Sequence, residues 1–249
     1  MENFKLYSQY YDLLYNDKNY EAEVIYLNKQ IKQFKKDSIK ILELGCGSGS
    51  HAFYLTKNGY KVTGVELSKA MYKIALKKKI INFELVNANI IDYKSSFKYD
   101  VVISMFHVIS YINNNNDILK CFKNTSNNLK KGGLFLFDIW FLPAVLTIKP
   151  ISKVKKISND FLSIIRVADS VINYKQNIVN VNFSIFIKDK INHKHISFEE
   201  IHFMRYFSLP EIELFAALSG FKILTCKEMG TENEPNEKTW GVLFILQKI

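Results

Sequence analysis

Short apolar runs alternate with amphipathic segments along most of the chain, and this pattern predicts strands and helices in turn. The apolar runs predict strands at residues 39–44, 60–66, 82–86, 100–105 and 134–138. Between them, residues 51–57, 68–78 and 117–129 have the spacing of amphipathic helices. Strands that alternate with helices in this way predict an α/β fold, a mostly parallel sheet with helices on both faces.

The pattern changes on either side of this core. Residues 1–36 have a helical pattern, whereas residues 179–187 alternate apolar and polar positions at a period of two, and residues 162–167 and 196–206 have a similar pattern. Ser208 and Glu211 then form a capping box for a helix, and strands follow at 221–225 and 241–247. We therefore predict an N-terminal helical cap (1–36), an α/β core (37–144 and 208–249) and a β-rich insertion (145–207) with no helix inside it.

The first predicted strand runs directly into Gly45, Gly47 and Gly49 and then into a helix. Glycine lets the backbone turn sharply and approach a ligand there. A Walker A loop needs a Gly-Lys-Ser/Thr sequence, which is absent, and a dinucleotide fingerprint needs its third glycine at position 50, which is Ser50. The GxGxG spacing instead favours a cofactor without a pyrophosphate, and S-adenosylmethionine is the candidate of that kind.

A second element is in register with the glycines. Glu66 lies 21 residues after Gly45, at the end of the next predicted strand. A carboxylate at that place can accept hydrogen bonds from both hydroxyls of a ribose. Met71, about one helical turn further on, can pack on an adenine face, and Asn89 follows the third strand, where a polar side chain can contact the adenine amino group.

Together these motifs resemble the class I S-adenosylmethionine-dependent methyltransferases. The resemblance rests on Glu43 with the three glycines, on Glu66, and on residues 100–105 and 129–133. It implies a Rossmann-like fold with a mostly parallel seven-stranded sheet and a small antiparallel insertion. It also implies S-adenosylmethionine as the cofactor and S-adenosylhomocysteine as the product. The chain departs from the family at Asn89, where Asp is commoner.

The flanking segments resemble the N,N-dimethyltransferases of nucleotide-linked amino sugars. This resemblance rests on residues 11–13, 20–23, 105–106 and 140–143. It implies that Tyr11 and Tyr20 close over the cofactor and that the β-rich insertion contributes to the substrate side. The implied cofactor-binding residues are Tyr11, Tyr20, Glu43, Gly45, Gly47, Glu66, Leu67, Met71, Asn89, Ile90 and Met105.

Candidates for the chemistry follow the fourth predicted strand. His107 is the best single candidate for a base, because imidazole titrates at about pH 6.5. In the sugar N-methyltransferases the proposed catalytic His falls at the position of Tyr111, so Tyr111 is a second catalytic candidate. Trp140, His202 and Arg205 are candidates for the substrate pocket, with Arg205 holding a phosphate or carboxylate. No His, Cys and Asp cluster has metal-ligand spacing, so we expect no metal.

Net charge and cysteine content bound the remaining possibilities. The formal charge is +10, yet only two of the 34 basic residues are Arg, whereas nucleic-acid sites favour the arginine fork. Three scattered cysteines and an N-terminus unlike a signal peptide predict a cytoplasmic protein. The most apolar stretch, residues 133–148, is too short to span a bilayer. We expect neither nucleic acid nor membrane as a partner, and either a monomer or a homodimer.

The sequence therefore predicts a methyltransferase that acts on an amine or hydroxyl of a small polar acceptor. The favoured acceptor is a nucleotide-linked amino sugar or a related precursor of a capsule or other cell-surface polysaccharide. Two alternatives stay open: an O-methyltransferase of another small phosphorylated metabolite, and an RNA-modifying or nucleic-acid-binding protein.

Overall fold

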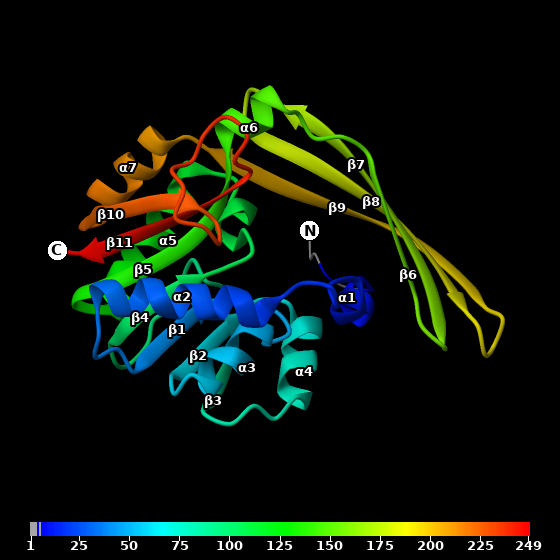
Figure 1. The fold of residues 1–249 in the computed structure, drawn as a ribbon, viewed down its shortest axis with the longest axis horizontal. Helices are drawn as coiled ribbons and strands as arrows, with labels where there is room; N and C mark the ends of the chain where they lie inside the picture. Colours follow the sequence, from blue (N-terminus) through cyan, green and yellow to red (C-terminus); the bar gives the residue numbers. More distant parts are fainter. Residues whose placement is uncertain (1–3, 5) are drawn as a thin grey trace.

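A single mixed sheet forms the centre of the protein in the computed structural model, which describes residue 4 and residues 6–249 (Figure 1). Within the described chain, seven strands of this sheet make up the core, in the order β3-β2-β1-β4-β5-β11-β10. β1 to β5 are parallel, and β10 and β11 are antiparallel to their neighbours. The bounds are β1 (Lys40–Leu44), β2 (Lys61–Glu66), β3 (Phe83–Asn87), β4 (Tyr99–Ser104), β5 (Leu129–Phe141), β10 (Phe221–Glu228) and β11 (Gly241–Lys248).

Helices cover both faces of this core, as the pattern predicts. On one face, α2 (Tyr20–Phe34) and α3 (Ser50–Lys57) bury apolar side chains against Leu134 and Leu136 of β5. On the other face, α5 (Asn115–Asn128) and α7 (Leu209–Ala217) pack against Phe135 and Phe137 of the same strand. Successive side chains of a strand point to opposite faces, so β5 supplies both halves of the core. α4 (Lys69–Lys77) follows β2 and is N-capped by Ser68.

Four long strands form a ribbon that leaves the core after α6 (Leu142–Thr147). They are β6 (Lys153–Ser158), β7 (Leu162–Asn173), β8 (Ile178–Asp189) and β9 (His195–Phe207), each antiparallel to the next. β9 returns to the core beside β5 through Tyr206 and Phe207. Figure 1 shows the ribbon curving past α1 (Ser8–Leu14), and Tyr7 and Leu14 are buried against its inner face. The N-terminal helix thus lies between the core and the ribbon.

The predicted elements differ from the structure in three places. The insertion predicted without a helix begins inside α6, whose first turn contains Pro143, a residue that fits the start of a helix. β6 was not anticipated, because its two apolar residues, Val154 and Ile157, are three positions apart and give no alternation at a period of two. β5 is longer than predicted, since it pairs with both β4 and β11. No helix in the described part of the chain combines the length and the apolar run needed to cross a membrane.

Candidate active site

The glycine loop has a backbone that side chains would disturb. Gly45, Gly47 and Gly49 have φ angles of +71°, +56° and +78°, in the left-handed region that favours glycine. A Cβ atom on Gly45 would lie 2.5 Å from a methyl group of Val108. The N–H groups of Gly45 and Cys46 donate to the carbonyl of Val65, which ties the loop to β2. The loop is therefore a fixed turn between β1 and α3 with its backbone open to a ligand.

Glu66, at the end of β2, lies beside this loop. Its carboxylate accepts hydrogen bonds from the backbone N–H groups of Gly47 (2.8 Å) and Ser68 (2.7 Å). Burial raises the pKa of Glu66, and the backbone hydrogen bonds oppose that rise. A carboxylate offers about four lone-pair positions. Two remain for a ligand after these contacts.

Glu43 lies behind the loop rather than on the cavity. It is buried, and burial together with the charge of Glu66 raises its pKa to about 8. Its Oε2 atom has no hydrogen-bond partner among the described residues, and its Oε1 atom lies 3.7 Å from His51 Nδ1. A neutral Glu43 next to Glu66 avoids two buried like charges. Its position suits support of the loop better than direct contact with a ligand.

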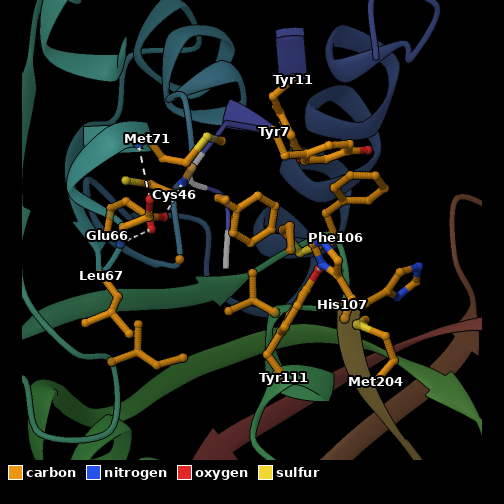
Figure 2. A pocket seen from close by; sticks show the side chains of 18 of the residues that line it. Tyr7, Tyr11, Cys46, Glu66, Leu67, Met71, Phe106, His107, Tyr111 and Met204 are labelled. Carbon is orange, nitrogen blue, oxygen red and sulfur yellow. Dashed lines mark hydrogen bonds between the residues drawn. The ribbon is translucent and has the colours of Figure 1, made fainter. Parts of the chain in front are cut away.

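One cavity of about 840 Å³ joins the loop to the ribbon (Figure 2). This volume is within the usual range for small-molecule sites. Figure 2 shows Glu66, Leu67 and Met71 on one side of the cavity and Tyr111 and Met204 on the other. The residues predicted for the cofactor that line it are Tyr11, Tyr20, Gly45, Gly47, Glu66, Leu67, Met71, Asn89, Ile90 and Met105.

The N-terminal helix is fastened to the glycine loop. Asp12 of α1 accepts a hydrogen bond from the Ser48 hydroxyl (2.6 Å) and pairs with Lys78 (2.8 Å). These contacts hold Tyr11 in the cavity wall. Burial raises the pKa values of Tyr11 and Tyr20, so both phenols are neutral at physiological pH. The helix therefore covers the cavity with neutral aromatic rings.

Tyr111 and His202 meet in the wall of the cavity although they are 91 residues apart in the chain. The Tyr111 hydroxyl lies 2.7 Å from His202 Nδ1, and His202 Nε2 lies 3.0 Å from a carboxylate oxygen of Glu200. The same carboxylate oxygen accepts the backbone N–H of Phe4 (2.6 Å). Burial raises the pKa of Tyr111 well above its ordinary value. A phenol, an imidazole and a carboxylate are thus arranged in series.

His107 lines the cavity but is held by a different group. Its Nδ1 atom lies 2.8 Å from Asp138 Oδ2, and its backbone N–H donates to Asp138 Oδ1 (3.0 Å). In Figure 2 the His107 ring is turned away from Tyr111 and Glu66. Burial alone raises the pKa of Asp138, but the neighbouring His107 outweighs it and holds that pKa below its usual range. The two catalytic candidates therefore lie in separate hydrogen-bonded groups.

The structure brings two of the three predicted substrate-binding residues to the cavity. Trp140 and His202 line the cavity, but Arg205 does not. The Arg205 guanidinium is buried, pairs with Glu211 (3.1 Å) and lies over the ring of Phe207. The structure therefore does not bring Arg205 to the place where the sequence interpretation put it.

Two cavity or near-cavity residues were missed by the sequence interpretation. Arg166, the other arginine of the chain, lines the cavity from β7. Glu200 lies behind His202, two positions before it on β9, so both side chains are on one face of that strand. That spacing was a usable signal. No three His, Cys, Asp or Glu side chains of residue 4 and residues 6–249 gather to hold a metal ion.

Comparison with known proteins identifies the fold and the domain. Residues 41–133 match the methyltransferase domain family. The chain is similar to the dTDP-3-amino-3,4,6-trideoxy-alpha-D-glucopyranose N,N-dimethyltransferase of Streptomyces venezuelae, at 24% identity over 216 residues, 86% of this chain and 89% of that protein.

Two solved structures share the fold over nearly the whole chain. An S-adenosylmethionine-dependent methyltransferase from Clostridium acetobutylicum has a TM-score of 0.83 at 21% identity, over 98% of this chain and 97% of the other. A sugar N-methyltransferase from Streptoalloteichus has a TM-score of 0.84 at 17% identity, over 98% and 93%. The predicted fold class, enzyme class and cofactor are confirmed. Residues 41–133 thus match a methyltransferase domain, and the whole chain has the fold of the S-adenosylmethionine-dependent methyltransferases.

Proposed function

We propose that this protein transfers a methyl group to the amino group of a nucleotide-linked amino sugar. The observation that carries the proposal is the cavity of about 840 Å³, which joins Glu66 and the glycine loop to the Tyr111–His202 pair. Substrates of open α/β sheets bind beside the carboxyl ends of the strands, where both groups lie. The name of the relative from Streptomyces venezuelae supports this acceptor class.

The residues present fit S-adenosylmethionine. Glu66 has free lone pairs for the ribose hydroxyls, the glycine loop leaves room for the amino acid part, and Leu67, Met71 and Ile90 offer an apolar wall for the adenine. When bound, the cofactor would supply a sulfonium methyl group for in-line attack by the lone pair of the acceptor, with S-adenosylhomocysteine as the leaving group. Neutral tyrosines above it exclude water without adding charge.

The acceptor nitrogen needs a free lone pair, and the Tyr111–His202–Glu200 series can provide it. The carboxylate of Glu200 near His202 Nε2 favours a proton on that nitrogen, so Nδ1 accepts the Tyr111 hydroxyl. The oxygen of Tyr111 then has lone pairs directed at the cavity. An ammonium nitrogen there gives a proton to Tyr111 as the phenol gives its own to His202. The nitrogen becomes neutral, and the imidazolium is stabilised by Glu200.

The proposal also covers the cellular compartment of the protein and the reaction that consumes the methylated product. A nucleotide-linked sugar is an activated donor, so the reaction class that consumes the product is glycosyl transfer, into a cell-surface polysaccharide or a related product. We place the protein in the cytoplasm. Its three cysteines are free thiols, with Cys46 and Cys121 buried, which suits a reducing compartment.

Binding of the cofactor is tested by calorimetry with purified protein. We expect S-adenosylmethionine to bind, and Glu66→Ala to weaken the binding by about tenfold or more, since a buried acceptor of two hydrogen bonds is lost. Glu84→Ala is a matched control, because Glu84 lies on the neighbouring strand β3 and does not line the cavity. Absence of binding at millimolar cofactor in the wild type contradicts the proposal.

Turnover separates the two catalytic candidates. Tyr111→Phe is expected to lower the methylation rate by about a hundredfold or more, a typical contribution of proton transfer. His107→Asn is expected to change it by less than about tenfold, because His107 is held by Asp138 and turned from Tyr111. Equal losses in the two variants, or no loss in either, remove the assignment of Tyr111.

A further inference from the structure

The electric charges in the cavity wall are separated into two regions. Glu66 and Asp117, the carboxylates of the described residues that line the cavity, come from the α/β core. The lining Lys and Arg residues are Lys153 and Arg166, and both come from the ribbon. The acidic side is where the cofactor, itself a cation, fits. The basic side is left for a ligand of opposite charge.

The basic side is built on the inner face of the ribbon. Arg166 of β7 is paired across the sheet with Lys155 of β6, and Lys153 is paired with Ala168 of β7. Directly paired residues in neighbouring strands have their side chains on the same face, so the three cations lie on the face that covers α1. Lys155 is neutralised by Asp17 at 2.7 Å. Lys153 and Arg166 have no such partner in the described part of the chain.

Arg166 is half-buried and held by neutral groups. Its guanidinium donates to the hydroxyls of Tyr7 (2.8 Å) and Tyr15 (3.0 Å) and lies over the ring of Phe183. Burial raises the pKa of Tyr7, so that phenol does not neutralise the cation. The buried Nε atom of Arg166 finds no hydrogen-bond partner among the described residues. A partly desolvated charge whose donors are incompletely used is expected to attract an anion.

The carboxylate of Glu200 lies on the same face of the ribbon as Arg166, and it already has partners. In the strand register, Glu200 lies opposite Phe183, and Phe183 lies opposite Ala168, which is two residues after Arg166 on β7. Its Oε1 atom contacts the Phe4 N–H and His202. Glu200 is not within ion-pair distance of Arg166. The charge on Arg166 is therefore available to a ligand.

We propose that Arg166, with Lys153 at the rim, is the binding site for the phosphate groups of the acceptor. The inference rests on the proposed function and deepens it, because it assigns the side chains that hold the phosphate groups of that acceptor. Tyr7 and Tyr15 position the guanidinium fork, and both flank α1, which is also fastened to the glycine loop through Asp12. The anion and the cofactor thus share one covering helix.

The test is calorimetry on protein saturated with S-adenosylhomocysteine. The three probes are a nucleoside diphosphate, the corresponding uncharged nucleoside and inorganic pyrophosphate. We expect the nucleoside diphosphate to bind more tightly than the nucleoside, and to lose affinity as salt is raised from about 50 to 500 mM. Binding of pyrophosphate as tight as that of the nucleoside diphosphate supports the phosphate site and shows that the nucleoside adds little. Equal affinities for nucleoside and nucleoside diphosphate overturn the inference.

Variants locate the site. Arg166→Gln is expected to weaken nucleoside diphosphate binding by about tenfold to a hundredfold, and Arg166→Lys by less, because lysine keeps the charge without the fork. Lys156→Gln is the matched control, since Lys156 is exposed on the other face of β6. If Arg166→Gln does not fold, Lys153→Gln at the exposed rim takes its place, with a smaller expected loss. Unchanged affinity in the folded variants overturns the inference.

Affinity for S-adenosylhomocysteine separates this inference from the proposed function. It is expected to stay the same in Lys153→Gln, at the exposed rim, and to change much less than the nucleoside diphosphate affinity in Arg166→Gln, which also removes the hydrogen bonds to Tyr7 and Tyr15 beside α1. Methylation of an amino sugar nucleotide that is unaffected by these variants contradicts the phosphate site alone. A protein that binds phosphate at Arg166 but methylates no amine contradicts the proposed function alone.

Discussion

Gly45→Ala is the substitution for which the structure gives the most direct value of the loss in the free energy of unfolding. The residue has φ +71°, which costs a non-glycine residue about 1–2 kcal/mol. The added Cβ atom would also lie 2.5 and 2.8 Å from the two methyl groups of Val108, and overpacking of this kind costs about 1–3 kcal/mol. The two effects sum to about 2–5 kcal/mol, a large part of the total stability of about 5–15 kcal/mol of a typical domain.

Urea unfolding followed by circular dichroism measures this loss, and two further variants separate its causes. Gly132 has φ +70° and open space at its Cβ position, so Gly132→Ala carries the backbone cost alone, about 1–2 kcal/mol. In a double-mutant cycle, Val108→Ala removes both methyl groups and is expected to recover about 1–3 kcal/mol of the Gly45→Ala cost. A Gly45→Ala cost no larger than that of Gly132→Ala, or no coupling to Val108, would refute the reasoning.

Three other substitutions test the buried carboxyl, a helix cap and the cavity wall. The pKa of Glu43, raised to about 8, lies above its unfolded value, so its contribution to stability is full below about pH 4.3 and is lost as pH rises toward 8. Glu43→Gln is therefore expected to flatten the fall in the free energy of unfolding between pH 5 and 8, a fall on the order of several kcal/mol, and an equally steep fall in the variant contradicts the assignment. Ser208→Ala breaks the capping box of α7 and is expected to cost about 1 kcal/mol in urea unfolding, with Ser197→Ala, an exposed position, as a neutral control. Glu200→Gln is expected to lower the methylation rate, because the positive charge that His202 takes up loses its partner, and an unchanged rate argues against the series.

Local features of the site could be predicted from the sequence because they depend on neighbouring residues. The turn at Gly45 follows from glycine spacing after an apolar strand, and Glu66 follows from the register of the next strand. The helix cap at Ser208 is contained in four consecutive residues. Each of these is decided within a few residues of chain, so the alternation of apolar and polar positions was sufficient.

Contacts between distant segments could not be predicted in the same way. Tyr111 and His202 were assigned to different roles, because nothing in the alternation of β9 shows which side chain faces η1 (Val108–Tyr111). Arg205 was chosen over Arg166 for a similar reason, since each lies on a strand whose faces the pattern does not distinguish. The strand register decides it: Arg205 is three positions after His202, so it lies on the other face of the ribbon and pairs with Glu211, whereas Arg166 faces the cavity.

The central claim is that one cavity brings a sulfonium methyl group to the nitrogen of a nucleotide-linked amino sugar. Transfer of labelled methyl from S-adenosylmethionine to such a sugar, compared with the same nucleotide sugar carrying a hydroxyl in place of the amine, tests it most directly. The account predicts label on the amino compound alone, with most of it lost in Glu66→Ala and Tyr111→Phe. Equal labelling of the hydroxyl compound, or no labelling of any amino sugar by protein that binds the cofactor, would contradict it.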